Sequence, residues 1–290
     1  MGKTTRIKGD LDDVEALLEI INVLKDVSTN RFFTFAQRKA DFAKFLEIFL
    51  IFFNKLENSD TKCPLVRNNN PRTDVLIITS EQGFMAQLNS RVCSAAKKEI
   101  EKYPEAEVVC VGFRGEEKCK QLGMTVAKTY RDLEGIDHYR LSLQIRDYLI
   151  DRIMTGKSGR CLCIYIWPKS FNILKPRVVR LLPAEELLSG EEETAGTARK
   201  KRKSSFISES SIDGIMKVLA DIWVSSRLFE IMSDTKLAEA ASQAQQLEQA
   251  IEGLNTEKKQ LASAFKRSGR EDVNKAMREV FSASSVIRRR

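Results

Sequence analysis

The sequence predicts an α/β protein in which long N- and C-terminal helices form an antiparallel coiled coil and the residues between them form a Rossmann-like α/β domain. All six prolines lie between Pro64 and Pro183, and residues 10–63 contain no glycine either. Because proline breaks helix interiors and glycine weakens them, both ends of the chain suit long helices. The middle instead holds short β-branched runs, which are typical of buried strands.

Four segments are expected along the 290 residues. They are an N-terminal stalk helix over 1–60, an α/β globular domain over 73–184, a charged linker over 185–211 and a C-terminal stalk helix over 212–290. Long helices on opposite sides of a folded domain cannot each find a partner locally. We therefore expect them to pair with each other, which buries both apolar seams.

The N-terminal helix is predicted from a heptad seam. Alternating steps of three and four residues from Leu11 to Leu56 visit fourteen positions, and eleven of them are apolar. Asp10 is the expected cap at the start of this helix. The polar run at 58–60 and the stretch from Arg67 to Pro71 have the composition of turns and end it.

The middle section alternates strands with helices, which indicates an α/β sheet covered by helices. Strands are expected over 74–80, 108–111, 161–167 and 176–182, the last two as a hairpin-like pair, and helices over 89–103, 116–121 and 138–154. Cys161 and Cys163 alternate along one strand, so both should lie on the same face of the sheet.

The linker carries opposite blocks of charge. Five glutamates between 185 and 193 are followed by five consecutive basic residues, Arg199 to Lys203. This composition is typical of an exposed, mobile segment. The basic block also resembles a nuclear-localisation or nucleic-acid patch, but a solvated loop or a tether folding onto the acidic block explains it more simply.

The C-terminal helix is predicted from Ile212 onward. Stepping from Leu237 to Phe265 by threes and fours gives eight apolar residues at nine positions. As one helix, residues 212–267 would reach roughly 84 Å at about 1.5 Å per residue, which is too long for one face of such a domain. Ser268 and Gly269 mark a soft point in this helix, and an apolar stripe resumes after them.

Composition excludes several classes of protein. The six cysteines form no Cys-x-x-Cys pair and the chain has a single histidine, so we expect reduced, buried thiols of a cytosolic protein and not a zinc site. The N-terminus lacks an apolar signal core. The one strongly apolar run, 45–53, is too short to span a bilayer and includes Glu47. The net charge of +8 fits solvated helix faces or an acidic partner.

No catalytic motif emerges. The Gly-Lys-Thr at 2–4 and the Gly-Lys-Ser at 156–158 resemble the end of a phosphate-binding loop, but the required glycine five residues earlier is missing: the first has no room for it and the second has Asp151. Gly112 and Gly115 are too few for a dinucleotide motif, and His138 has no nucleophile pattern nearby. We predict no catalytic, cofactor-binding or metal-binding residue, and a mechanical or interaction role.

A family resemblance appears in residues 74–90, Asp-Val-Leu-Ile-Ile-Thr-Ser-Glu-Gln-Gly-Phe-Met-Ala-Gln-Leu-Asn-Ser. They resemble the gamma subunit of F-type ATP synthases, in which an apolar strand precedes Ser/Thr-Asp-Arg/Lys-Gly-Leu-Cys-Gly and an Asn-Ser pair opens a helix. Gly83 and Asn89-Ser90 match that pattern, whereas 81–82 and 85–86 depart from it. Weaker similarities follow in the family's order, at 6–7, 24–31, 181–183 and 273–283.

The resemblance implies the central-stalk, or rotor, subunit of a rotary F-type ATP synthase or ATPase. In that family the coiled coil turns inside a ring of alternating alpha and beta subunits, and the α/β domain sits on the epsilon subunit and the membrane c-ring. The subunit couples proton or sodium translocation to ATP synthesis or hydrolysis. It implies a non-catalytic, peripheral subunit on the cytoplasmic face of the inner (plasma) membrane, with no cofactor, no nucleic-acid partner and no direct membrane insertion.

The resemblance also implies where other subunits are contacted. The residues are Arg31 in the N-terminal helix, Glu81, Gln82 and Met85 around the loop after the first strand, and Arg270, Val273 and Met277 near the C-terminal tip. The family's Arg-Gln near that tip is Gly269-Arg270 here, and a family glutamate is Ala276, which makes this a divergent member. The alternatives are a non-rotary coiled-coil adaptor or interaction protein using the same fold and, third, nucleic-acid binding through the basic block at 199–203.

Overall fold

The structure, a computed structural model, describes residues 2–54, 61–81, 85–131, 138–184 and 211–287; at 38, 41–54, 86 and 282–287 it describes the backbone only. Most of the predicted linker, the turn at 58–60 and the predicted contact residue Gln82 lie outside these ranges. The chain divides into two units: Met1–Asn30 with Gln243–Arg290, called the coil unit here, and Arg31–Ser242, called the sheet unit.

The two long helices are α1 (Lys3–Asn54) and α6 (Ile212–Ile287). The expectation that Asp10 caps α1 is wrong, because the helix already begins at Lys3. The soft point predicted at Ser268 and Gly269 does not interrupt α6. Ser268 is buried, and its hydroxyl lies 2.7 Å from the Thr4 hydroxyl. Pairing with the first turn of α1 therefore stabilises both segments as helix.

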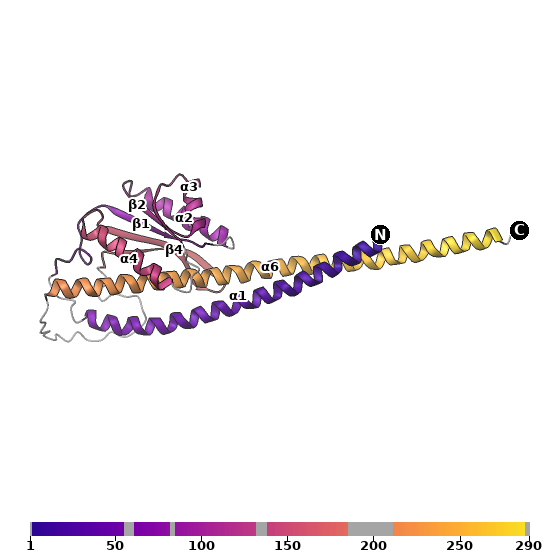
Figure 1. Cartoon of the computed structure of the whole chain (residues 1–290), viewed down its shortest axis with the longest axis horizontal. Helices are drawn as coiled ribbons and strands as arrows, with labels where there is room; N and C mark the ends of the chain where they lie inside the picture. The colour runs from indigo at the N-terminus through magenta and orange to yellow at the C-terminus, as the bar shows by residue number, and fades with distance from the viewer. Residues whose placement is uncertain (1, 55–60, 82–84, 132–137, 185–210, 288–290) are drawn as a thin grey trace. The chain divides into compact units, whose positions relative to one another are not determined.

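In the coil unit the two helices run antiparallel (Figure 1). Glu15 accepts an ion pair from Lys258 at 3.0 Å, and Lys25 pairs with Glu248 at 2.9 Å. In both pairs the two residue numbers add up to 273, as antiparallel register requires. Between these pairs lies an apolar cluster made of Val14, Leu18, Ile21, Ile251, Leu254 and Leu261. The predicted coiled coil is confirmed.

The sheet unit holds five strands in the order β3-β2-β1-β4-β5. They are β1 (Thr73–Ile78), β2 (Glu107–Val111), β3 (Val126–Tyr130), β4 (Arg160–Ser170) and β5 (Ile173–Leu182). The first four run parallel, and β5 is antiparallel to β4. The sequence gave no sign of β3, because this edge strand is short and half of it is exposed, with Lys128 at its centre.

Alternation along the strands gives the sheet two apolar faces. Leu76 and Ile78 join a cluster with α4 (His138–Met154) and the first part of α6, whereas Val75 and Ile77 face α2 (Ala86–Ile100) and α3 (Phe113–Gln121). Figure 1 shows α2 and α3 on one side of the sheet and α4 on the other. Cys161 and Cys163 both belong to the α4 face, as the alternation predicted.

The order of connections defines a switch point in the sheet. The chain passes from β1 through α2 to β2 and through α3 to β3, then returns through α4 to β4 on the other side of β1. In doubly wound sheets such a reversal separates the loops at the carboxyl ends of the two strands, and function commonly lies there. The loop after β1, which contains Glu81 and Met85, starts at this point.

A buried ion pair connects α1 to α6 within the sheet unit. The Lys39 ammonium donates to the carboxylate of Asp234, whose side chain is only 2% exposed. Burial raises the pKa of Asp234 to about 6, despite the opposing effect of Lys39. Glu230 on α6 raises this pKa further, and Arg177 on β5 lowers it. The carboxylate is thus held in an apolar setting by a single close cation.

Replacing Asp234 with asparagine should change the pH dependence of stability. From about pH 4 to pH 6 the folded wild-type chain retains a proton that the unfolded chain releases, so its free energy of unfolding falls as pH rises. We expect this fall to be up to about 3 kcal/mol, from a shift of about two pKa units, and to be absent in Asp234→Asn. Urea unfolding at several pH values measures it.

Asp147→Asn, which removes an exposed carboxylate, is the matched control for loss of one charge. If Asp234→Asn and the wild-type chain gave parallel curves of unfolding free energy against pH, the proposed cost of burying the Asp234 carboxylate would be wrong.

Candidate functional site

The C-terminal end of α6 extends past the paired segment of the coil unit (Figure 1). Lys3, the first residue of α1, lies 3.7 Å from Glu271. The Val273, Met277 and Val280 side chains follow at four- and three-residue spacing, which places them on one face of the helix. They are 57, 56 and 68% exposed. We call these three residues the C-terminal stripe.

An exposed apolar stripe on a helix end is the type of surface that another protein covers. Arg270, one turn before it, is also exposed. The structure therefore brings together the three contact residues predicted near the tip. Arg31 lies far along the chain on α1, with an exposed side chain, next to Phe32, whose buried ring packs against Phe171 with centroids 5.0 Å apart.

The loop after β1 begins with a fixed set of polar contacts. The Asn89 amide donates to the Ser80 hydroxyl at 2.9 Å and accepts from the Ser80 backbone amide at 3.3 Å. Gly112 has φ +97°, and a Cβ there would come within 2.6 Å of the Thr79 carbonyl oxygen. Only glycine fits at this approach of two loops. The Asn89 that opens α2 thus holds the loop in place, a role that the sequence alone did not reveal.

The predicted contact residues around this loop are placed very differently. The Glu81 carboxylate is half-buried and accepts from the Phe113 backbone amide at 3.0 Å. The Met85 side chain is 1% exposed and packs in the core beneath α2. Met85 can therefore influence a partner only by positioning the loop, whereas part of Glu81 reaches the surface.

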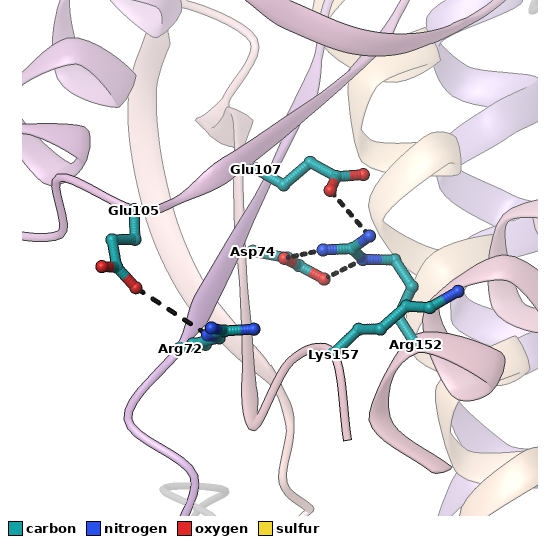
Figure 2. Close-up of a pocket in the computed structure, with 6 residues that line it drawn as sticks. All are labelled: Arg72, Asp74, Glu105, Glu107, Arg152 and Lys157. Atoms are coloured by element: carbon teal, nitrogen blue, oxygen red, sulfur yellow. Dashed lines mark hydrogen bonds and ion pairs between the residues drawn. The ribbon is translucent and has the colours of Figure 1, made fainter. Parts of the chain in front are cut away.

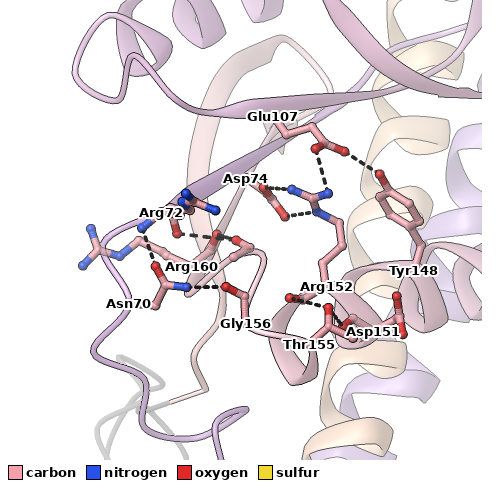
Figure 3. Close-up of polar contacts among 11 residues, drawn as sticks. Asn70, Arg72, Asp74, Glu107, Tyr148, Asp151, Arg152, Thr155, Gly156 and Arg160 are labelled. Atoms are coloured by element: carbon pink, nitrogen blue, oxygen red, sulfur yellow. Dashed lines mark hydrogen bonds and ion pairs between the residues drawn. The ribbon is translucent and has the colours of Figure 1, made fainter.

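The opposite edge of the sheet carries a cluster of charges (Figures 2 and 3). Asp74 and Glu107 are neighbours on β1 and β2, near the amino ends of the two strands. Arg152 from α4 donates to both Asp74 oxygens at 2.7 and 2.9 Å, and lies 2.7 Å from Glu107. The Tyr148 hydroxyl donates to Glu107 at 2.6 Å. One guanidinium thus neutralises two carboxylates that would otherwise repel each other.

The same residues line an open pocket of about 280 Å³ together with Arg72, Glu105 and Lys157. Its three acidic and three basic side chains give no net charge for a charged ligand. Burial, followed by the hydrogen bond to Glu107, raises the pKa of Tyr148 to about 12, so this phenol is a poor base near neutral pH. We interpret the cluster as a structural clamp that joins β1, β2 and α4.

The Gly156-Lys157-Ser158 segment lies beside this clamp and forms the turn that ends α4. The Lys157 backbone amide donates to the Arg152 carbonyl at 2.9 Å, and Gly156 has φ +73°. A phosphate-binding loop instead leads from a strand into the start of a helix, whose free amides hold the anion. The interpretation of this segment as a chance match is therefore confirmed.

The six cysteines are free and buried, as predicted. Three of them gather between the sheet and the helices α2 and α3, with the Sγ atoms of Cys93 and Cys119 3.9 Å apart. His138, at the start of α4, stacks on Phe229 with ring centroids 5.1 Å apart. No helix among the described residues is both long and apolar enough to cross a lipid bilayer.

Comparisons with known proteins agree along the whole chain. Residues 3–286 match the ATP synthase family model. The ATP synthase gamma chain of Halothermothrix orenii is 20% identical over 287 residues, which is 97% of this chain and 98% of that protein. The gamma chain of Pelotomaculum thermopropionicum is 23% identical over 226 residues, 77% of each chain.

Two solved structures share the fold at low sequence identity. A chain of the Euglena gracilis mitochondrial ATP synthase, in an OSCP/F1/c-ring assembly, aligns with a TM-score of 0.63 and 14% identity over 99% of this chain and 95% of that one. A chain of the Tetrahymena thermophila mitochondrial ATP synthase, from its central stalk and c-ring, gives a TM-score of 0.59 and 14% identity over 80% and 99%.

Replacing Arg152 with methionine tests the clamp. The Arg152 side chain is 12% exposed and that of Asp74 is 5% exposed. Removing the guanidinium leaves two adjacent carboxylates without their cation, which should lower the free energy of unfolding by about 3 kcal/mol. Arg114→Met removes an exposed ion pair on α3 and should cost less than about 1 kcal/mol. Chemical unfolding of both variants measures the difference; equal costs would contradict a clamping role.

Proposed function

The chain belongs to the ATP synthase gamma family, and on that basis we propose that it is the rotor of a rotary complex, carrying torque between a membrane ring and a catalytic ring without itself binding or hydrolysing nucleotide. It is the central-stalk subunit of an F-type ATP synthase. The family match over residues 3–286, which includes both long helices and the sheet, carries this conclusion.

The coil unit has the physical properties that torque transmission needs. A shaft that twists must keep its two helices in register, and a single apolar seam resists sliding poorly. Here the apolar cluster around Val14 and Ile251 is bordered by ion pairs on both sides, Glu15 with Lys258 and Lys25 with Glu248. Each exposed pair contributes little stability, but the pairs favour one register over its neighbours.

The proposed partners follow from the family. They are the alpha and beta subunits of the catalytic ring, the epsilon subunit and the membrane c-ring. The chain would lie peripherally at the cytoplasmic face of the inner membrane and couple ion transport to ATP synthesis or hydrolysis. Relatives named as ATP synthase gamma chains and similar chains from central-stalk and c-ring assemblies support membership of such a complex.

Contacts to the catalytic ring are proposed at three places. The C-terminal stripe, with Arg270, suits an apolar collar around the tip of the shaft. The loop after β1, with Glu81 and Gln82 and with Met85 beneath it, and Arg31 on α1 suit contacts to a catalytic subunit. The stripe is the sharpest of these proposals, because water-exposed apolar side chains gain most from being covered.

Reconstitution tests the rotor role directly. The isolated chain should show no ATPase activity, because it supplies no catalytic residue in this proposal. Mixed with the cognate alpha and beta subunits, it should co-purify as one copy per ring and stimulate ATP hydrolysis. Mass measurement of the intact complex gives the copy number. Failure to assemble with the ring would favour the non-rotary adaptor.

The C-terminal stripe is tested by Val273→Ser with Met277→Ser. Both side chains are exposed in the chain itself, so folding should be preserved. Loss of their burial against the ring should cost about 2 kcal/mol, or about 30-fold in affinity. Lys275→Ser, on the other face of the same helix, is the control and should bind as the wild type does. Titration of labelled chain into alpha-beta ring measures both; unchanged affinity for the double variant would exclude the stripe as a contact.

A further inference from the structure

A groove on the sheet unit lies between α2 and the edge strand β5, away from the contacts proposed above. It has a volume of about 350 Å³. Its lining comprises Ser90, Arg91, Ser94, Ala95, Lys98 and Pro176. The five residues from α2 follow the spacing of one helix face, so one side of the groove is a continuous strip of that helix.

The two cations in the groove lack carboxylate partners among the described residues. Arg91 and Lys98 are both exposed and form no ion pair there. Elsewhere on α2 and α3, Lys102 pairs with Glu99 and Lys120 with Glu116, each at 2.7 Å. Uncompensated positive charge is therefore concentrated at this groove and not spread evenly over the two helices.

Arg91 is held in place by the strand. Its guanidinium donates to the Leu174 carbonyl of β5 at 3.2 Å, which fixes it across the gap between α2 and the sheet edge. The remaining N–H groups of the guanidinium stay available to a ligand. A pre-positioned cation loses less conformational freedom on binding than a mobile one.

The groove also has an apolar side. Pro176 and Ala95 contribute to its lining. By strand alternation Val178, which is 42% exposed, lies on the same face of β5 as Pro176 and extends this surface along the strand. The combination of cations, serine hydroxyls and apolar carbon indicates a ligand that is acidic and partly apolar.

We propose that this groove binds an acidic, partly apolar segment of another protein. Arg91 and Lys98 are seven residues apart on α2, about 10 Å at 1.5 Å per residue. A single small anion such as phosphate cannot contact both cations at that separation. A polypeptide with two carboxylates about 10 Å apart matches them, and its apolar residues cover Pro176 and Ala95. The inference does not depend on the rotor role.

Binding of a defined acidic peptide to the full chain tests the proposal. The probe is a fluorescein-labelled peptide of alternating glutamate and valine, measured by fluorescence anisotropy at physiological salt. Lys98→Glu should weaken binding at least about tenfold, because one attractive charge pair becomes repulsive. Lys97→Glu, the adjacent exposed lysine outside the groove, makes the same change in net charge and should shift affinity by less than about twofold. Thermal unfolding of both variants checks that they fold.

Several outcomes would overturn the proposal. One is the absence of peptide binding by the wild-type chain, and another is equal weakening by the two charge reversals, which would mean attraction to net charge alone. A third is displacement of the peptide by inorganic triphosphate at equal concentration, which would mean a small-anion site. A glutamine-valine peptide that binds as tightly as the glutamate peptide would also contradict it. If Lys98→Glu does not fold, Lys98→Gln and Lys97→Gln replace the pair.

Discussion

The antiparallel register of α1 against α6 is the constraint on which the other features depend. In the coil unit, Glu15 pairs with Lys258 and Lys25 with Glu248; in the sheet unit, Lys39 pairs with Asp234. The residue numbers add up to 273 in all three pairs. A slip of one residue would separate all three pairs and rotate the apolar seams apart, so each helix fixes the position of the other.

This register also decides which residues of α6 stay uncovered. Because α1 begins at Lys3, opposite Glu271, the residues of α6 that follow have no stretch of α1 to pair with. The C-terminal stripe is exposed for that reason, and the proposed contact with a catalytic ring would complete its burial. The end that transmits torque in this proposal is thus the part that the chain itself does not cover.

The two edges of the sheet have different tasks. At the amino edge, Arg152 joins Asp74 and Glu107 and satisfies most of the charge locally, which stiffens the attachment of α4. At the carboxyl edge, Asn89 and Gly112 shape the loop after β1, and Glu81 remains partly accessible. The α2–β5 groove is a third surface, and its unpaired cations distinguish it from the neutral clamp.

The sequence by itself determined the two long helices, the apolar strands and the family, because proline and glycine placement, the heptad seam and strand alternation are local patterns. It failed for β3, whose exposed residues at the sheet edge carry no such pattern, and for the cap at Asp10, because contacts with the far end of the chain extend α1 to Lys3. Only the tertiary structure decided that Met85 is buried and that Arg152 meets Asp74, 78 residues away. Such partners are chosen by the packing of helices on a sheet, and the spacing of residues in one segment contains no information about a partner in another.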